Sequence, residues 1–380
     1  MGTTDQNSKR EEEHLIISKP LRLILLRNGN HVLRSLFFII GFSVGLFFCL
    51  QLKAFHMSAT KSKQTLWSTL LLSNHSTTME IKQDQSQTQI LQHNMTDQEL
   101  FTKISSSSSS WFWRRHNNDE KMVVKVAFMF LTGGGLRLAD LWDKFFEGHE
   151  GFYSIYVHTN PSFQEHYPET SVFYSRRIPS QRRLLANALL DKSNQRFVLL
   201  SDSCIPLFNF TTIYDYLTGT NLSYIGSFDD PRTPGRGRYN PKMYPPINIT
   251  HWRKGSQWFE TTRELALHII EDTVYYKIFD QYCKPPCYMD EHYIPTFVHM
   301  LHGEMSANRS LTWVDWSRAG PHPARFIWPD VTDEFLNRIR FTDKCPYYGK
   351  DSENITSSKC VLFARKFTKE TLEPLLRISP

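Results

Sequence analysis

The stretch Met122-Val-Val-Lys-Val-Ala-Phe-Met-Phe-Leu131 is an almost unbroken run of β-branched and aromatic residues, and three glycines, Gly133 to Gly135, follow it closely. Such a run predicts a buried β-strand that leads into a loop. The next apolar positions recur with helical spacing, at Leu138, Leu141, Trp142, Phe145 and Phe146. They predict a helix, and Gly148 is a plausible end for it.

The same alternation continues downstream. Phe152-Tyr-Ser-Ile-Tyr-Val157 predicts a second strand, a helical stretch follows around 181–191, and Phe197-Val-Leu-Leu200 predicts a third strand. Strand, helix, strand, helix, strand is typical of an α/β domain with a mostly parallel sheet. Open sheets of this kind bind ligands beyond the carboxyl ends of their strands. The residues expected there are Gly133 to Gly135, His158 and Asp202, and the triple glycine is either a flexible turn or a place where the backbone approaches a diphosphate.

An uncharged apolar segment, residues 36–52, lies between Arg34 and Lys53 and is just long enough to cross a bilayer. The segment before it, 1–35, is rich in Lys and Arg, which predicts a cytoplasmic tail and a single-pass type II anchor. A cleaved signal peptide is the alternative. The long region before the apolar run, and the lack of a small-residue cleavage site after Leu52, favour the uncleaved signal-anchor.

Composition supports an ordered domain. The chain has 380 residues, of which 40% are hydrophobic, so disorder throughout is excluded. The net charge of +6 is spread along the chain, which makes nucleic acid a poor candidate partner. Residues 53–121 are polar and include the run Ser105 to Ser110, which predicts a flexible lumenal stem before a domain at 122–380.

Two features agree with a lumenal address. Seven Asn-X-Ser/Thr sequons follow the predicted anchor, at Asn74, Asn94, Asn209, Asn221, Asn248, Asn308 and Asn354. Five cysteines also follow it, at Cys204, Cys283, Cys287, Cys345 and Cys360, where disulfide bonds can persist. The odd count leaves one free thiol or an intermolecular pair, and the pairing stays open.

The densest cluster of reactive side chains is Cys283-Lys-Pro-Pro-Cys-Tyr-Met-Asp-Glu-His-Tyr293. A helix opened by the pattern Thr261-X-X-Glu264 leads to it. Zinc binding by Cys283, Cys287 and His292 lacks a fourth ligand at the usual spacing, so a disulfide is the natural alternative. The adjacent acids Asp290 and Glu291 could complement a helix N-terminus, or one of them could serve as a general base.

The order of several motifs resembles a known family. They are Tyr153-Ser-Ile-Tyr-Val-His158, Phe197-Val-Leu-Leu-Ser-Asp-Ser-Cys-Ile-Pro-Leu207, Gly255-Ser-Gln-Trp-Phe259, Asp290-Glu-His292 and Leu362-Phe-Ala-Arg-Lys-Phe367. This order is similar to that of the core-2/I-branching β-1,6-N-acetylglucosaminyltransferases of glycosyltransferase family 14, and in particular to a plant branch with the string Trp-Ser-X-X-Gly-Pro-His-Pro, here at Trp316 to Pro323. The resemblance covers residues 123–380. It implies a GT-A-like fold and an inverting glycosyltransferase that works without a divalent metal or other cofactor.

The resemblance also assigns candidate donor-binding residues. Ser201-Asp202-Ser203 offers one carboxylate where a metal clamp usually has two. Lys366 matches the family's phosphate-binding lysine, with Arg365 beside it, and the departing diphosphate is then neutralised by such cations. A further family arginine corresponds to Arg338 or Arg340, and Arg340 is preferred. His158 stands where animal members have an aspartate, and Tyr174 lies in a strand-like segment that the family places near the donor.

Glu291 matches the family's catalytic glutamate, the general base for the acceptor hydroxyl, and Asp290 is then its positioning neighbour. Trp316 is a candidate platform for an acceptor sugar, because pyranose faces pack on indole rings, and Trp313 is a weaker one. The resulting hypothesis is a Golgi transferase that moves a sugar, by resemblance N-acetylglucosamine, from a UDP-sugar to a glycan; related members use UDP-glucuronic acid or UDP-xylose. The alternative is an inactive membrane-anchored glycan-binding or scaffold protein, which the presence of Glu291 and Lys366 disfavours. A third hypothesis, a secreted hydrolase, is disfavoured because residues 53–380, which follow the predicted anchor, contain no Gly-X-Ser-X-Gly motif.

Overall fold

A computed structural model of the chain describes residues 94–114, 122–160, 162–163, 167–174, 176, 181–318, 320–341, 343–350 and 355–378. The predicted tail 1–35, the predicted anchor 36–52, and the sequons Asn74 and Asn354 lie outside these residues. Among the helices that the structure describes, none has the length and apolar character needed to span a bilayer.

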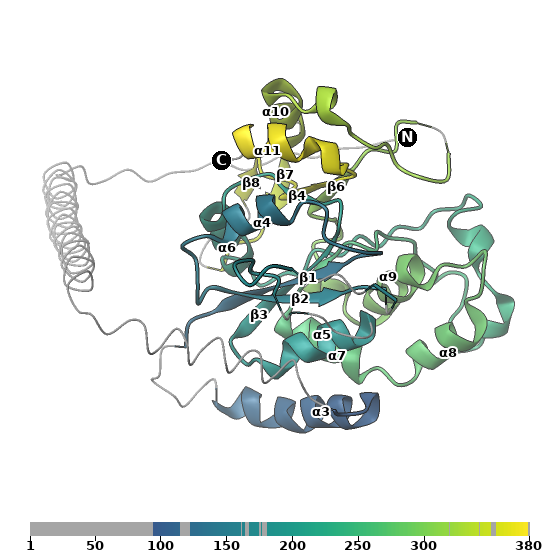
Figure 1. Cartoon of the computed structure of the whole chain (residues 1–380). Helices are drawn as coiled ribbons and strands as arrows, with labels where there is room; N and C mark the ends of the chain where they lie inside the picture. The colour runs from purple at the N-terminus through teal and green to yellow at the C-terminus, as the bar shows by residue number, and fades with distance from the viewer. Residues whose placement is uncertain are drawn as a thin grey trace, which may run out of the picture. The chain divides into compact units, whose positions relative to one another are not determined.

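The centre of the domain is a four-stranded sheet (Figure 1). Its strands are β1 (Lys125–Leu131), β2 (Tyr153–His158), β3 (Asn194–Ser201) and β5 (Glu260–Thr262), in the order β2-β1-β3-β5. Strand β1 runs parallel to both β2 and β3, and only β5 is antiparallel to its neighbour. The prediction of an α/β domain with a mostly parallel sheet is confirmed, and this arrangement fits a GT-A-like glycosyltransferase.

Strand β1 is buried on both faces because helices cover both. Its alternate side chains enter two separate hydrophobic clusters: Val126, Phe128 and Phe130 enter the first, and Ala127 and Met129 enter the second. A strand between two helical layers needs side chains that are apolar on both faces. This explains the nearly continuous apolar run in residues 122–131.

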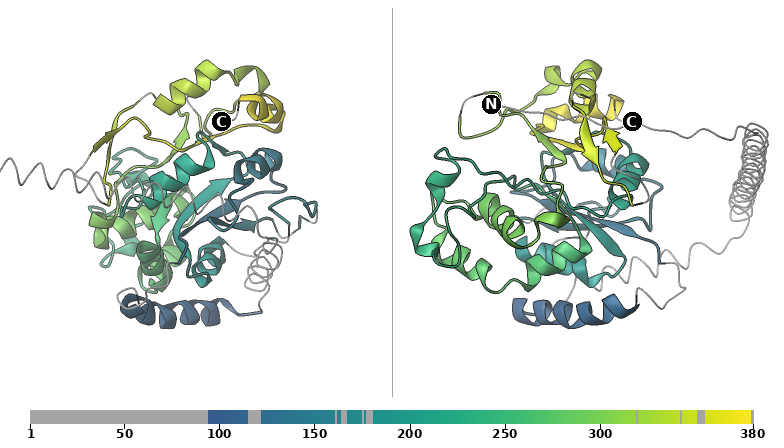
Figure 2. Two further views of the ribbon diagram at one scale, coloured as in Figure 1. Left: turned by 90° about the vertical axis from the view of Figure 1, so that its left-hand side faces the viewer. Right: turned by 180° about the vertical axis from the view of Figure 1, so that it is seen from behind.

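The helices divide between the two faces. Residues of α4 (Ala139–Phe146) and α6 (Phe210–Thr218) belong to the first cluster, and residues of α5 (Gln181–Leu190) and α7 (Arg263–Glu271) belong to the second. Figures 1 and 2 show the two pairs on opposite sides of the sheet. The predicted helix after the triple glycine is therefore present, and Gly148 follows it with a φ of 74°, a backbone conformation that suits glycine.

Part of the predicted stem is a helix, α3 (Asp97–Arg114), so the structure differs from a stem that is flexible to residue 121. Thr96 and Glu99 form a capping box at its start, in which the Thr96 amide donates to Glu99 at 2.7 Å and the Glu99 amide donates to Thr96 at 3.3 Å. Leu100 and Ile104 are almost fully buried in the second cluster. The apolar residues of this helix bind it to the domain despite the serine-rich composition that suggested a linker.

The remaining elements complete the domain beside the main sheet. Two small sheets contain β4 (Ile205–Pro206), β9 (Phe363–Arg365) and β6 (Thr312–Val314) in one, and β7 (Cys345–Tyr347) and β8 (Ile355–Ser357) in the other. The other α-helices are α8 (Tyr275–Tyr282), α9 (Met289–Leu301), α10 (Asp333–Phe341) and α11 (Leu372–Ile378). The 3₁₀ helices are η1 (Arg236–Arg238), η2 (Pro241–Met243), η3 (Gly303–Met305), η4 (Trp328–Asp330) and η5 (Lys369–Thr371).

Two local predictions need correction. The N-cap of α7 is Thr262 rather than Thr261, because it is the hydroxyl of Thr262 that accepts from the Leu265 amide in the first turn of the helix. The segment around Tyr174 is a turn, not a strand. Asp143 on α4 accepts hydrogen bonds from the backbone amide of Val172 and the hydroxyl of Ser171, which holds the chain in that turn.

Candidate active site

A pocket of about 560 Å³ brings together three of the predicted site residues, Glu291, Arg365 and Trp316. They come from the first turn of α9, the end of β9 and the loop after β6. The pocket is also lined by Asp229, Asp230, Arg232, Lys254, Trp258 and Val314, among others. Segments that are far apart in the sequence therefore form one cavity that is lined by both charged and aromatic side chains.

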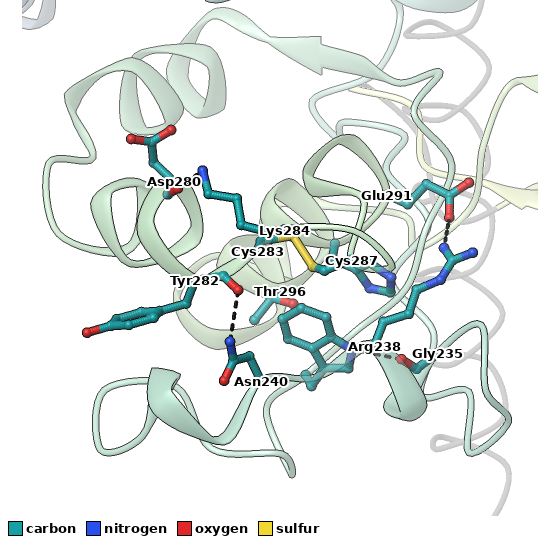
Figure 3. The surroundings of a disulfide bond; sticks show 12 residues. Gly235, Arg238, Asn240, Asp280, Tyr282, Cys283, Lys284, Cys287, Glu291 and Thr296 are labelled. Atoms are coloured by element: carbon teal, nitrogen blue, oxygen red, sulfur yellow. Dashed lines mark hydrogen bonds and ion pairs between the residues drawn. A yellow bond between two sulfur atoms is a disulfide. The ribbon is translucent and has the colours of Figure 1, made fainter.

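Glu291 lies in the first turn of α9, a position that favours an acid because the helix dipole is positive there. Its carboxylate receives hydrogen bonds from Arg238 Nη1 at 2.6 Å and from Lys254 Nζ at 2.5 Å, both to Oε2. Figure 3 shows the Arg238 side chain pointing toward Glu291. The neighbouring Asp290 instead lines a separate, largely apolar pocket of about 390 Å³. The two adjacent acids thus face different surroundings.

The ionisation of Glu291 is set by opposing effects. Partial burial raises its pKa, but the hydrogen bonds and charges of Lys254 and Arg238 outweigh burial, so the pKa lies below its ordinary value. Glu291 is therefore an ionised carboxylate at neutral pH and can accept a proton. Its main-chain carbonyl also accepts from the Gly255 amide at 2.8 Å, which ties the helix to the Gly255-Ser-Gln-Trp-Phe259 motif.

The cations predicted for the diphosphate lie at the end of β9. The guanidinium of Arg365 stacks over the ring of Trp258 at 4.3 Å from its centroid. Burial lowers the pKa of Lys366, and the charges of Arg365 and Arg325 lower it further, while Asp202 opposes them. Positive charge accumulated around one lysine favours a bound anion, because an anion relieves the mutual repulsion.

Asp202 lies directly after β3, as the sequence predicted, and is close to these cations. Its carboxylate forms an ion pair with Arg137 at 3.5 Å. In the part of the chain that the structure describes, no group of three or more His, Cys, Asp or Glu side chains is arranged to hold a metal ion. Asp202 is thus a carboxylate among cations.

Of the predicted donor residues, Arg365 lines this pocket, whereas Lys366, Asp202, His158, Tyr174 and Arg340 do not. His158 ends β2, and Tyr174 has an exposed fraction of 44% in its turn. Arg340 donates from Nε to the Leu207 carbonyl at 2.6 Å and thereby holds α10 near β4. Arg338 lies over the ring of Phe335 at 5.5 Å from its centroid. The choice between the two arginines remains a prediction.

The two candidate tryptophans have different surroundings. Trp316 lines the pocket and is 57% exposed, so its side chain is accessible to a ligand. Trp313 on β6 stacks on Phe326 with ring centroids 5.7 Å apart and packs against the first hydrophobic cluster. Trp316 is therefore the better placed of the two for an acceptor sugar.

The cysteines form two disulfides among the described residues, Cys283–Cys287 and Cys345–Cys360, and Cys204 is a buried free thiol. The disulfide beside α9, drawn in Figure 3, excludes the alternative of zinc thiolates at Cys283 and Cys287. His292 is fully buried and donates from Nδ1 to the Arg253 carbonyl at 2.9 Å. Burial lowers its pKa to about 4, so this ring is neutral and structural at neutral pH.

Five of the predicted sequons fall on described residues. Asn94, Asn209, Asn221 and Asn308 are exposed, and Asn248 is half-buried. Asn209 also caps α6, since its side-chain oxygen accepts from the Thr212 amide at 3.0 Å. That hydrogen bond leaves the side-chain nitrogen, the atom that carries a glycan, outside the cap.

Sequence reasoning missed Arg238 and Lys254, the two partners of Glu291. Lys254 directly precedes the Gly255-Ser-Gln-Trp-Phe259 motif, so its position was a usable signal. Arg238 ends the short helix η1 in an Arg-rich segment whose spacing carries no comparable signal. Only the packing of that segment beside α9 brings it to the carboxylate.

Comparisons with known proteins identify the family to which the chain is similar. The family model described as Core-2/I-Branching enzyme matches residues 126–340. The chain is also 34% identical over 309 residues to the glycosyltransferase BC10 of Oryza sativa subsp. japonica, and the match covers 67% of this chain and 76% of that protein. The matched family region includes β1 from Val126 onward, the whole of β3, and Glu291.

Proposed function

The chain belongs to the Core-2/I-branching enzyme family and is a glycosyltransferase, and on this basis we propose that it transfers a sugar from a UDP-sugar to a glycan hydroxyl by an inverting, metal-independent reaction. By resemblance the donor is UDP-N-acetylglucosamine. The observation that carries the proposal is the pocket that Glu291 and Arg365 both line, so that a carboxylate and a cation border one cavity.

The residues present suit the two demands of this reaction: removal of a proton from the acceptor hydroxyl, and stabilisation of the negative charge on the departing diphosphate. The acceptor oxygen bonds to the anomeric carbon as the bond from that carbon to the UDP oxygen breaks, and the proton of the acceptor hydroxyl passes to Glu291. Negative charge then grows on the departing diphosphate. Lys366 and Arg365 compensate it, because fixed cations stabilise a developing anion without reorganising.

The metal-independent part rests on the donor set. Ser201-Asp202-Ser203 supplies one carboxylate, and Arg137 already pairs with it. A hard divalent cation prefers several oxygen ligands, commonly two carboxylates. The cations around Lys366 provide positive charge beside Asp202, where a metal ion would otherwise supply it.

We further propose that the protein is a single-pass type II Golgi membrane protein whose catalytic domain is lumenal. The uncharged segment 36–52 and the basic residues before it support this topology. Exposed sequons and two disulfides fit an oxidising lumenal compartment, since disulfides rarely persist in the cytosol.

The test uses the purified full-length chain with a panel of UDP-sugars and a mixture of oligosaccharides from plant cell-wall glycans. UDP release is followed with EDTA and with added manganese. We expect release to persist in EDTA; strict dependence on manganese would exclude the metal-independent mechanism.

Two substitutions separate the proposed roles. Glu291→Gln should reduce transfer by about 10² to 10⁴-fold, the usual contribution of a general base, and leave UDP binding nearly intact. Lys366→Ala should weaken UDP binding by about 10-fold or more, because it removes a charge-assisted contact. Glu264→Gln and Lys369→Ala, both at exposed positions, are the matched controls. Full activity of the Glu291→Gln protein would remove Glu291 from the reaction.

A further inference from the structure

We propose that Arg238 and Lys254 are positioning residues that hold the Glu291 carboxylate by its Oε2 atom and keep it ionised, so that Oε1 is the atom that accepts the proton. The inference rests on the proposed function of Glu291 as the base. It assigns a role to two cations that the sequence did not single out.

The geometry around the carboxylate is asymmetric. Arg238 Nη1 and Lys254 Nζ both donate to Oε2, at 2.6 and 2.5 Å. Within the described part of the chain, neither cation forms a hydrogen bond to Oε1. Two charge-assisted bonds to one oxygen fix the plane of the carboxylate and leave the second oxygen for a substrate proton.

Both cations are held in place by their surroundings. The guanidinium of Arg238 also lies over the ring of Tyr288, the N-cap residue of α9, at 4.7 Å from its centroid. The backbone of Lys254 forms two hydrogen bonds with Phe228, at 2.7 and 2.9 Å. The next amide, of Gly255, bonds to the Glu291 carbonyl at 2.8 Å. Because these contacts already restrict Arg238 and Lys254, the two cations lose little further side-chain entropy when they hold the Glu291 carboxylate.

Other charged groups near Glu291 do not replace these two. On α9 itself, His292 is neutral above pH 4 and Asp290 is a like charge. The remaining charged groups that line the pocket are Asp229, Asp230, Arg232 and Arg365. Asp229 pairs with Arg236, Asp230 pairs with Arg232, and Arg365 stacks on Trp258. Arg238 and Lys254 are the cations that bond to the base.

This arrangement has a chemical consequence that can be measured. A general base works only while it is ionised, and the two cations favour ionisation at acidic pH. Neither cation takes the proton: it moves from the acceptor hydroxyl to Oε1, while Arg238 and Lys254 stay protonated. Removal of one cation raises the pKa of Glu291, so activity is lost at a higher pH on the acidic side.

The experiment measures the pH profile of kcat/KM for UDP release with the full-length chain, the active UDP-sugar of the panel and the cell-wall oligosaccharides. Lys254→Met and Arg238→Gln should each move the acidic limb up by about one pH unit, and lower kcat more than they raise KM for the donor. Lys254→Arg should restore the limb to within a few tenths of the original value. Lys242→Met, at an exposed lysine of η2, is the control and should leave the profile unchanged.

Three outcomes overturn the inference or its premise separately. An unmoved acidic limb in both cation variants, with Glu291→Gln inactive, contradicts the positioning role and leaves Glu291 as the base. A higher KM for the oligosaccharide with an unmoved limb would make the cations acceptor-binding groups instead. Full activity of Glu291→Gln refutes the proposed function itself. Thermal unfolding identifies a variant that has lost its fold. The two substitutions lie in different segments of the chain, so one variant remains informative if the other does not fold.

Discussion

Replacing Gly255 by alanine should damage the site through backbone geometry alone. A Cβ atom at this position would lie 2.1 Å from the Gly226 carbonyl oxygen and 2.6 Å from Pro295 Cγ. An ordinary contact needs 3.4 Å or more, so the Gly255 segment must move by about 1 Å away from the Gly226 backbone and from Pro295 on α9. Such overpacking costs about 1–3 kcal/mol, less about 0.4–1 kcal/mol from the reduced entropy of the unfolded chain.

This displacement affects catalysis because Gly255 directly follows Lys254 in the chain and its amide donates to the Glu291 carbonyl. A displacement of about 1 Å at a catalytic group reduces the rate by about 10²-fold. We therefore expect Gly255→Ala to lose about two orders of magnitude in UDP release. The melting temperature should fall by about 2–4 °C for each kcal/mol lost.

Activity and thermal unfolding are measured on the same preparation. The matched control is Gly303→Ala, where the added Cβ meets nothing within 4 Å. Wild-type activity and stability in Gly255→Ala would show that the Gly255 segment can move away from Gly226 and α9 without cost, and would refute the argument that this contact holds the base.

Three predictions concern stability. His292 is buried with a pKa near 4, below its ordinary value of 6.5, so the unfolded chain binds more protons between these pH values. The free energy of unfolding should therefore fall by about 3 kcal/mol from pH 6.5 to pH 4, and urea titrations of His292→Phe should show a weaker dependence of this free energy on pH. Breaking the Cys345–Cys360 disulfide, which spans 15 residues, should cost about 3 kcal/mol, measured as a lower melting temperature for Cys345→Ser; no change would mean that the loop is unconstrained. Glu260→Gln leaves the buried Arg196 without its ion pair and should cost about 3–5 kcal/mol in denaturant titrations, whereas the exposed Glu264→Gln should cost little.

The core of the fold was predictable because its signals are local. Residues 126–131 of the apolar run alternate between two hydrophobic clusters, and the helical spacing after the triple glycine corresponds to α4. The helix α3 was not predictable from composition, since the run Ser105 to Ser110 outweighed the two apolar side chains that bind it to the domain. The turn at Tyr174 was also mistaken for a strand, because only contacts with Asp143 distinguish the two.

The residue types of the site were predictable from the sequence, but the contacts between them were not. The motif containing Glu291 and the Arg365-Lys366 pair were recognisable as strings. Their meeting near one pocket depends on β9 pairing with β4 and β6 beside the end of β3. The placement of Arg340 on the Leu207 carbonyl likewise depends on how α10 packs.

By itself the sequence determined the strand and helix order, the uncharged segment 36–52, the sequons and the identity of the reactive groups, because each is a property of neighbouring residues. The tertiary structure alone decided which cysteines pair, and that Arg238 and Lys254 reach Glu291. Those contacts join residues separated by 53 and 37 positions, and hydrogen bonds over such separations exist only after the backbone has packed. The pKa of Glu291 follows from those contacts, so it is a property of the folded chain.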